Sequence, residues 1–298
     1  PIYASTVAEV DVDGARLTLV APGLQALLGE GSYYLEFASG QHEGHRFDID
    51  LLGTTDQVVS LDLRGSHNTL SALPSSGIRF SQAVVRSHRL LGEVYPISQF
   101  RGANDPASAD QVQFFRGAGY DSYFLLDAGG RRRWVSSGDT DLKDAHHVVI
   151  PPGEGAFVRL SNDGGEASVL VTGHLRDHAF IQPLQLGYNL LAPSAPLEMS
   201  PLTRGLTLAN GFLAGVDPAG ADQVQLWLGD LVQGTLGYRS YFLLEADGHR
   251  HWTGATDGDL TDEDRSTLFR GDRAFFFQAA SEPHRSYRVP ALEIQRER

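Results

Sequence analysis

Two acidic loops are the most chemically specific feature of this 298-residue chain. The loops GDTDLKD and TDGDLTD align with each other, and each places three aspartates in the same pattern. Calcium takes several hard oxygen ligands from flexible loops, so both loops are candidate calcium sites. Neither loop has the spacing or the closing glutamate of an EF-hand, which favours the alternative that the side chains form Asx-turns or cap a short helix. The candidate ligands are Asp139, Asp141 and Asp144 in the first loop and Asp257, Asp259 and Asp262 in the second.

Aromatic side chains at equivalent positions suggest a second kind of site. Tyr120 and Tyr238 begin two similar runs, and Trp134 and Trp252 end them. A flat apolar ring can stack on the C–H groups of a sugar, so these four residues are candidate ligand-binding residues for an extracellular polysaccharide. Aromatic residues inside strand-like runs commonly belong to the core, where each buries a large apolar area. Both interpretations are open at the level of sequence.

Histidine spacing gives only weak indications of a metal site. His174 and His178 have the spacing of zinc ligands on a helix but lack the glutamate of the HExxH pattern, and their surroundings favour strand and loop. His42 and His45 lie in an expected turn. The sequence contains no GxSxG, P-loop or dinucleotide-binding pattern. We therefore predict a non-enzymatic protein without catalytic residues.

The candidate residues lie in a stretch that the chain contains twice. ADQVQFF (109–115) returns as ADQVQLW (221–227), and YDSYFLLDAGGRRRW (120–134) returns as YRSYFLLEADGHRHW (238–252). The separation between the copies is constant up to a loop and grows once, within that loop. A duplicated supersecondary unit is expected to behave in this way.

Apolar and polar residues alternate with the two-residue period of β-strands in both copies and in the residues before them. Each copy reads as a hairpin closed by a glycine turn, and Asp13-Gly14 between alternating apolar residues predicts another hairpin near the start. We predict an all-β fold, with an N-terminal antiparallel β module (1–88) followed by two homologous β-sandwich or barrel-like repeat units. These units are expected to cover residues 89–180 and 181–298.

Composition restricts the functional classes. The net charge of −13 argues against a nucleic-acid partner, because phosphate binding needs a basic surface. The absence of cysteine excludes disulfides and thiolate chemistry. No apolar run is long enough to predict a membrane span. The sequence begins at Pro1 without a methionine, and we expect a mature extracellular or cell-surface chain from which a signal peptide has been removed.

The repeated signature resembles that of an uncharacterised family of secreted, β-rich, two-repeat proteins found mainly in Verrucomicrobia and related bacteria. The matching features are SGQHEGHRFDI (39–49), the two ADQV…YxSYFLL…W stretches and IQPLQLGYNLLAP (181–193). The resemblance implies an exported protein of the cell surface or matrix. It supplies no activity and no catalytic residues.

The expected function is a non-enzymatic extracellular structural protein that self-assembles into a surface layer, sheath or filament. Residues 1–12 or 288–294 are predicted to add a strand to the sheet edge of a neighbouring copy, since an unpaired edge accepts another strand. The alternative is a secreted carbohydrate-binding or adhesive module that uses the repeat aromatics.

Overall fold

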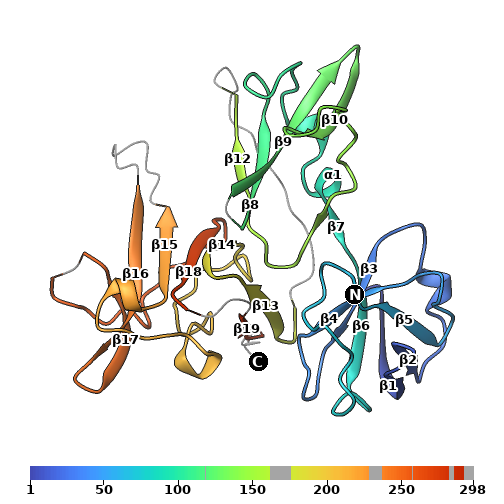
Figure 1. The fold of residues 1–298 in the computed structure, drawn as a ribbon, viewed down its shortest axis with the longest axis horizontal. Coiled ribbons are helices and arrows are strands. Elements are labelled where there is room, and N and C mark those ends of the chain that lie inside the picture. Colours follow the sequence, from blue (N-terminus) through green and yellow to red (C-terminus); the bar gives the residue numbers. More distant parts are fainter. Residues whose placement is uncertain (118, 162–175, 228–236, 257, 282–284, 292–298) are drawn as a thin grey trace, which may run out of the picture. The chain divides into compact units, whose positions relative to one another are not determined.

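The computed structural model describes residues 1–117, 119–161, 176–227, 237–256, 258–281 and 285–291. The chain divides into two compact units. Unit 1 contains residues 1–88, 175–183 and 288–298, and unit 2 contains residues 89–174 and 184–287. Almost all regular structure is antiparallel β-sheet, so the prediction of an all-β fold is confirmed (Figure 1). The predicted domain boundaries stay a prediction, and unit 1 takes in residues 175–183 and 288–298 besides residues 1–88.

Helices are few and short in the part of the chain that the structure describes. They are α1 (Leu91–Val94) and the 3₁₀ turns η1 (Gln25–Leu27), η2 (Ile97–Gln99), η3 (Leu208–Asn210) and η4 (Pro218–Gly220). None of these described helices is long and apolar enough to cross a bilayer.

Unit 1 is built on a closed six-stranded antiparallel barrel with the strand order β1-β2-β5-β4-β3-β6. The predicted hairpin at Asp13-Gly14 is confirmed, since Asp11 pairs with Arg16 across it. The strands are β1 (Tyr3–Asp11), β2 (Arg16–Leu19), β3 (Tyr33–Phe37), β4 (Arg46–Ile49), β5 (Val58–Asp62) and β6 (Gln82–Ser87).

Alternation along the strands gives the barrel two different faces. Side chains of successive residues point to opposite sides of a strand, so apolar residues at every second position fill the interior. The buried interior includes Leu35, Phe37, Phe47, Ile49, Val59, Leu61, Ala83 and Val85. The intervening residues of β3, β4 and β6 point outward, and several of them are polar yet buried. Glu36 is 0% exposed, and Arg46 is 2% exposed.

A segment from much later in the chain covers this polar outer face. His178 lies 2.8 Å from Oε1 of Glu36, and Arg176 Nη2 lies 3.2 Å from Oε2 of the same carboxylate. Arg176 Nη2 also donates to Tyr34 Oη at 2.9 Å, and Arg46 Nη1 donates to the Ile181 carbonyl at 3.0 Å. The covering segment therefore binds the barrel through charge-assisted contacts as well as through packing.

Gly44 permits the covering segment to lie directly on the barrel. Its φ of +88° is unfavourable for other residues, and a Cβ at this position would lie 2.7 Å from the Cα of Phe180. The Gly44 carbonyl also accepts a hydrogen bond from Ile181 N at 3.1 Å. The fold thus explains why a glycine stands at position 44 of the stretch SGQHEGHRFDI. The segment continues as β13 (Phe180–Leu184), which pairs with β19 (Arg285–Val289).

The first strand is already paired inside the barrel, contrary to its expected role as a free edge. Residues Tyr3–Thr6 pair with β6, and residues Val7–Asp11 pair with β2. Because the barrel is closed, strand addition at residues 1–12 would require part of it to open. The second expected donor, 288–294, lies partly outside the described residues, and its described part includes the end of β19.

Unit 2 contains two larger sheets and a small pair formed by β7 (Arg89–Leu90) and β11 (Val149–Ile150). The first sheet has the order β10-β9-β8-β12, and the second has the order β14-β18-β15-β16-β17. The strands of the first are β8 (Gln111–Arg116), β9 (Gly119–Ala128), β10 (Arg131–Ser136) and β12 (Phe157–Arg159). Those of the second are β14 (Gly187–Leu191), β15 (Gln223–Trp227), β16 (Tyr238–Ala246), β17 (His249–Gly254) and β18 (Phe275–Ala279).

The pairing of residues is the same at equivalent positions of the two sheets. Trp134 pairs with Leu125 in the first sheet, and Trp252 pairs with Leu243 in the second. The aspartate of the ADQV motif is buried in both. Asp110 accepts hydrogen bonds from Arg101 N and Ser161 N, both at 2.7 Å. Its counterpart Asp222 accepts hydrogen bonds from backbone N–H groups in the equivalent loops. Each aspartate thus ties two loops to the first strand of its copy.

Replacing Glu36 by glutamine is expected to destabilise unit 1 by about 3–5 kcal/mol. The reason is that Arg86, Arg176 and His178 would lose the carboxylate that compensates their desolvation. Urea unfolding followed by far-UV circular dichroism measures the change. Glu9→Gln, at an exposed position of β1, is the matched control. Equal unfolding midpoints for the two variants would contradict this role of Glu36.

The ion pair between Glu36 and His178 should also make the stability depend on pH. Burial alone would raise the pKa of Glu36, but the hydrogen bond from His178 and the charges of Arg176 and Arg86 hold that pKa below its usual value. Burial alone would lower the pKa of His178, but its bonds to Glu36 and Asp177 raise it. The contribution is therefore fully present between about pH 4.3 and 6.5, is lost in acid as Glu36 is protonated, and is lost in alkali as His178 is deprotonated.

His178→Gln should remove the alkaline part of this dependence. We expect the wild-type unfolding midpoint to fall more than that of the variant between about pH 5.5 and about pH 8.5. Parallel profiles for the two proteins would show that His178 is not the titrating group.

Candidate functional site

The two repeat tryptophans belong to the core of unit 2. Trp134 is 0% exposed and Trp252 is 1% exposed. Each indole N–H donates to a backbone carbonyl, Trp134 to Tyr95 at 2.8 Å and Trp252 to Leu206 at 2.7 Å. No ring face of either residue is accessible to a ligand in this structure. Of the two interpretations of the repeat aromatics, the core interpretation therefore applies to the tryptophans.

The two repeat tyrosines are exposed. Tyr120 is 48% exposed and Tyr238 is 44% exposed. Each lies opposite an aromatic residue of the neighbouring strand, Tyr120 opposite Phe115 and Tyr238 opposite Trp227. The ring centroids are 5.2 Å and 4.9 Å apart, and both pairs are edge-to-face. The two copies thus present equivalent aromatic pairs, Phe115 with Tyr120 and Trp227 with Tyr238, at corresponding ends of their strands.

Both pairs meet at one residue of β18. The ring centroid of Phe276 lies 5.5 Å from Phe115 and 5.8 Å from Tyr238. Phe157 lies between Tyr120 and Phe276, at 6.0 Å and 5.8 Å respectively. The resulting group is called the aromatic cluster, and it consists of Phe115, Tyr120, Phe157, Tyr188, Trp227, Tyr238 and Phe276. Four of its rings are between 39% and 48% exposed: those of Tyr120, Tyr188, Trp227 and Tyr238.

A polar side chain also lies beside these rings. Arg116 and Asp121 do not belong to the cluster, because they alternate with Phe115 and Tyr120 along β8 and β9 and therefore lie on the opposite face of the sheet. Gln225 Nε2 donates to Tyr188 Oη at 3.4 Å. Partial burial raises the pKa of Tyr238, and the nearby Tyr120 raises it further, so the Tyr238 phenol is a neutral donor at ordinary pH. The cluster combines apolar ring faces with fixed hydrogen-bonding groups.

The first acidic loop uses its carboxylates within the loop itself. Asp139 accepts hydrogen bonds from the backbone N–H groups of Asp141 and Lys143, at 2.9 and 3.1 Å. These bonds lower the pKa of the Asp139 carboxyl. Asp144 accepts from His146 N at 2.8 Å. Such bonds are Asx-turn chemistry, as the alternative interpretation expects.

The second acidic loop is described only in part. Asp262 accepts a hydrogen bond from Asp264 N at 2.9 Å, Asp259 lies in a described turn, and Asp257 lies outside the described residues. Among the described residues, neither loop brings three potential ligand atoms together as a metal site would. Calcium binding at these loops gains no support from the described geometry.

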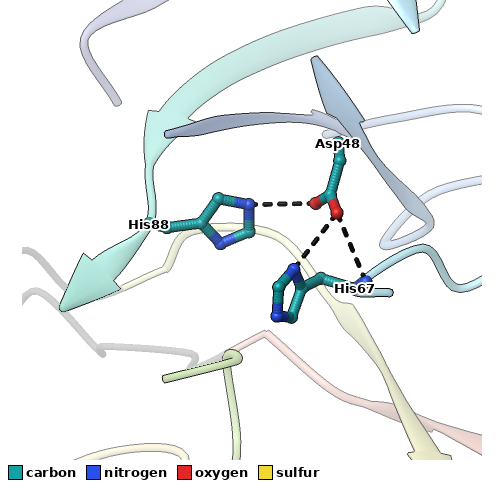
Figure 2. Close-up of side chains that lie close together, drawn as sticks. All are labelled: Asp48, His67 and His88. Carbon is teal, nitrogen blue, oxygen red and sulfur yellow. Dashed lines mark hydrogen bonds and ion pairs between the residues drawn. The ribbon is translucent and has the colours of Figure 1, made fainter. Parts of the chain in front are cut away.

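A different polar cluster lies on the outer face of the barrel of unit 1, and it was not expected from the sequence. Figure 2 shows Asp48 between two imidazoles. His88 Nε2 lies 2.9 Å from Oδ1 of Asp48, and His67 Nδ1 lies 3.1 Å from Oδ2. Asp48 lies on β4, His67 follows β5, and His88 follows β6. These residues are far apart in the sequence, and the pairing of β4 with β5 and of β3 with both β4 and β6 brings them together.

The loop after β5 holds the cluster in place. Asp48 N donates to Asn68 Oδ1 at 2.7 Å, and His67 N donates to Asp48 Oδ2 at 3.3 Å. Arg46 Nε donates to the His67 carbonyl at 3.1 Å. Burial alone would raise the pKa of Asp48, but the hydrogen bonds from His67 and His88 bring it well below its usual value. Asp48 is therefore a carboxylate at all ordinary pH values.

Ser66 does not turn this cluster into a nucleophilic triad. Its hydroxyl oxygen lies 3.4 Å from Nδ1 and 3.5 Å from Nε2 of His67. An oxygen at nearly equal distances from both ring nitrogens is not aligned with the lone pair of either one. A general base must accept the proton of its nucleophile along such a lone pair.

Acrylamide should quench only one of the three tryptophans, because Trp227 is 39% exposed while Trp134 and Trp252 are buried. Trp227→Phe is expected to remove the quenchable fraction of the emission. Trp252→Phe is the control and should leave that fraction in place. If quenching survives in Trp227→Phe, the exposure of the aromatic cluster is different from that described here.

Comparison with known proteins adds no assignment to these sites. No family model matches the chain, and searches of the curated proteins and of the solved structures return no match. The resemblance to the secreted two-repeat family stays a prediction, and functional inference rests on the geometry of the two clusters.

Proposed function

We propose that the aromatic cluster of unit 2 binds polysaccharide, and that the protein acts as a carbohydrate-binding or adhesive module. The observation that carries this proposal is the meeting of Tyr120 and Tyr238 in one cluster around Phe276. The expectation that the chain is extracellular, which comes from the sequence, is part of the same proposal.

The chemistry of the cluster fits a sugar. A pyranose ring has an apolar C–H face that stacks on an aromatic ring and hydroxyl groups at its rim. Tyr120, Tyr188, Trp227 and Tyr238 provide partly exposed rings. Gln225 and the phenol groups provide hydrogen-bonding partners for hydroxyls at the rim. Binding sites of this type combine apolar surface with a few polar groups that fix orientation.

Several exposed rings favour a polymer over a single sugar. Covering about 50 Å² of one ring at roughly 25 cal/mol per Å² contributes about 1 kcal/mol, which is less than a tenfold gain in affinity. A chain that contacts several rings in succession accumulates such contributions, because the rings are held on one protein scaffold. A polysaccharide is therefore the occupant that this arrangement suits.

Self-association into a layer or filament stays a prediction. The first strand is closed into the barrel, as described above. One outer strand of each of the two larger sheets of unit 2 carries charged or imidazole side chains, Arg131 and Arg133 on β10 and His249 and His251 on β17. Charged residues on an edge strand oppose the addition of another strand. Among the described residues, no contact favours assembly over glycan binding.

Tyr120→Ala and Tyr238→Ala should each weaken polysaccharide binding by about 5–10-fold, and the double variant should abolish measurable binding. A glycan array identifies the ligand, and co-sedimentation with cellulose, chitin and xylan measures retention on insoluble polymers. Bound ligand should also protect Trp227 from acrylamide. Phe80→Ala is the control, because Phe80 is 71% exposed but lies in unit 1.

A blank array, or equal binding by the double variant and the wild type, would refute the proposal. Sedimentation velocity separates the main alternative. If the tyrosine variants change the oligomeric state and leave glycan retention unchanged, the aromatic cluster is a contact between copies of the chain.

A further inference from the structure

We propose that Asp48, His67 and His88 form a binding site for a divalent transition-metal ion of the zinc class. This site lies on unit 1 and is independent of the polysaccharide site proposed for unit 2. Each of the three residues offers one ligand atom, and these atoms all lie within 4.8 Å of one another.

Two contacts in the cluster are close in length to the separation of ligand atoms around a metal ion. The two imidazole nitrogens lie 2.9 and 3.1 Å from the two carboxylate oxygens. Zinc binds histidine nitrogen and carboxylate oxygen at about 2.0–2.1 Å, so neighbouring ligand atoms around a tetrahedral ion are about 3.3 Å apart. The ligand atoms of the cluster lie within 4.8 Å of one another, so zinc binding would draw the side chains together around the ion.

The ligand types select the class of metal. Two imidazoles and one carboxylate suit zinc and related transition metals. Calcium requires six to eight oxygen ligands, and magnesium prefers a nearly octahedral oxygen shell. A cluster with a single carboxylate supplies neither.

The burial of the cluster defines an inner and an outer side. The side chain of His88 is fully buried, whereas those of Asp48 and His67 are 16% and 20% exposed. A metal ion held by the three residues would thus be shielded from solvent on the side of His88 and accessible to solvent on the side of Asp48 and His67. Three protein ligands and one open position are the arrangement in which zinc also binds a water molecule or an external ligand.

The cluster is also preorganised. Asn68 fixes the backbone of Asp48, and Arg46 fixes the backbone of His67. His88 packs between two rings, with centroids 4.9 Å from Tyr34 and 4.8 Å from His67. Ligands held in position by their surroundings lose little conformational freedom on binding.

Titration of tag-free, chelator-treated protein with ZnCl₂ tests this proposal, with isothermal calorimetry as the measurement. We expect one zinc ion per chain at the cluster, and a visible absorption spectrum typical of tetrahedral nitrogen and oxygen ligation when Co²⁺ replaces Zn²⁺. His67→Gln and Asp48→Asn should each weaken the binding by about tenfold or more. His147→Gln, at an exposed histidine of unit 2, is the matched control and should bind as the wild type does.

Circular dichroism shows whether each variant is folded. If Asp48→Asn does not fold, His67→Gln decides the outcome, since His67 lies at the more exposed side of the cluster. Absence of zinc binding by the wild type, or zinc binding of unchanged affinity in folded His67→Gln, would overturn the proposal. Polysaccharide retention measured on the same variants separates this result from the function proposed for unit 2.

Discussion

The buried carboxylate of Glu36 is the interaction on which the architecture of unit 1 depends. It lies on the outer face of a barrel, where an ordinary strand would present a solvated side chain, and it is nevertheless 0% exposed. The cost of this burial is offset by Arg86, Arg176 and His178. Two of these partners belong to a segment much later in the chain. The ion-pair network therefore binds a distant segment to the barrel, and it converts part of the barrel's outer face into a second buried layer.

The same outer face holds the Asp48 cluster, because side chains at every second position of a strand point to the same face. Glu36 and Tyr34 alternate with the apolar residues of β3, and Asp48 and Arg46 alternate with those of β4. The polar residues of unit 1 thus form one layer rather than scattered surface groups. In one part of that layer arginine and histidine side chains pair with Glu36, while Asp48 accepts hydrogen bonds from two imidazoles and from the backbone N–H of His67.

Unit 2 uses duplication in a different way. Buried features are kept in both copies, namely the tryptophan with its indole bond to a carbonyl and the aspartate that ties two loops. Exposed aromatic pairs recur as well, although burial would not require them to be aromatic. Phe157 and Phe276 lie at corresponding places, because Phe157 pairs with Gln113 and Phe276 pairs with the aligned Gln225. The two sheets therefore share a framework, and both copies contribute an aromatic ring to the cluster at this place.

The sequence by itself determined the all-β class, the hairpin at Asp13-Gly14 and the alignment of the two copies. These features depend on local periodicity and turn chemistry, which adjacent residues specify. It could not separate the buried Trp134 from the exposed Tyr120, because both lie in runs of the same period and type. Tertiary structure decided that question, and it also decided that β1 is paired on both sides. The Asp48 cluster depends entirely on tertiary structure, since its three residues meet only when β5, β4, β3 and β6 pair with one another, and no local pattern encodes that strand order.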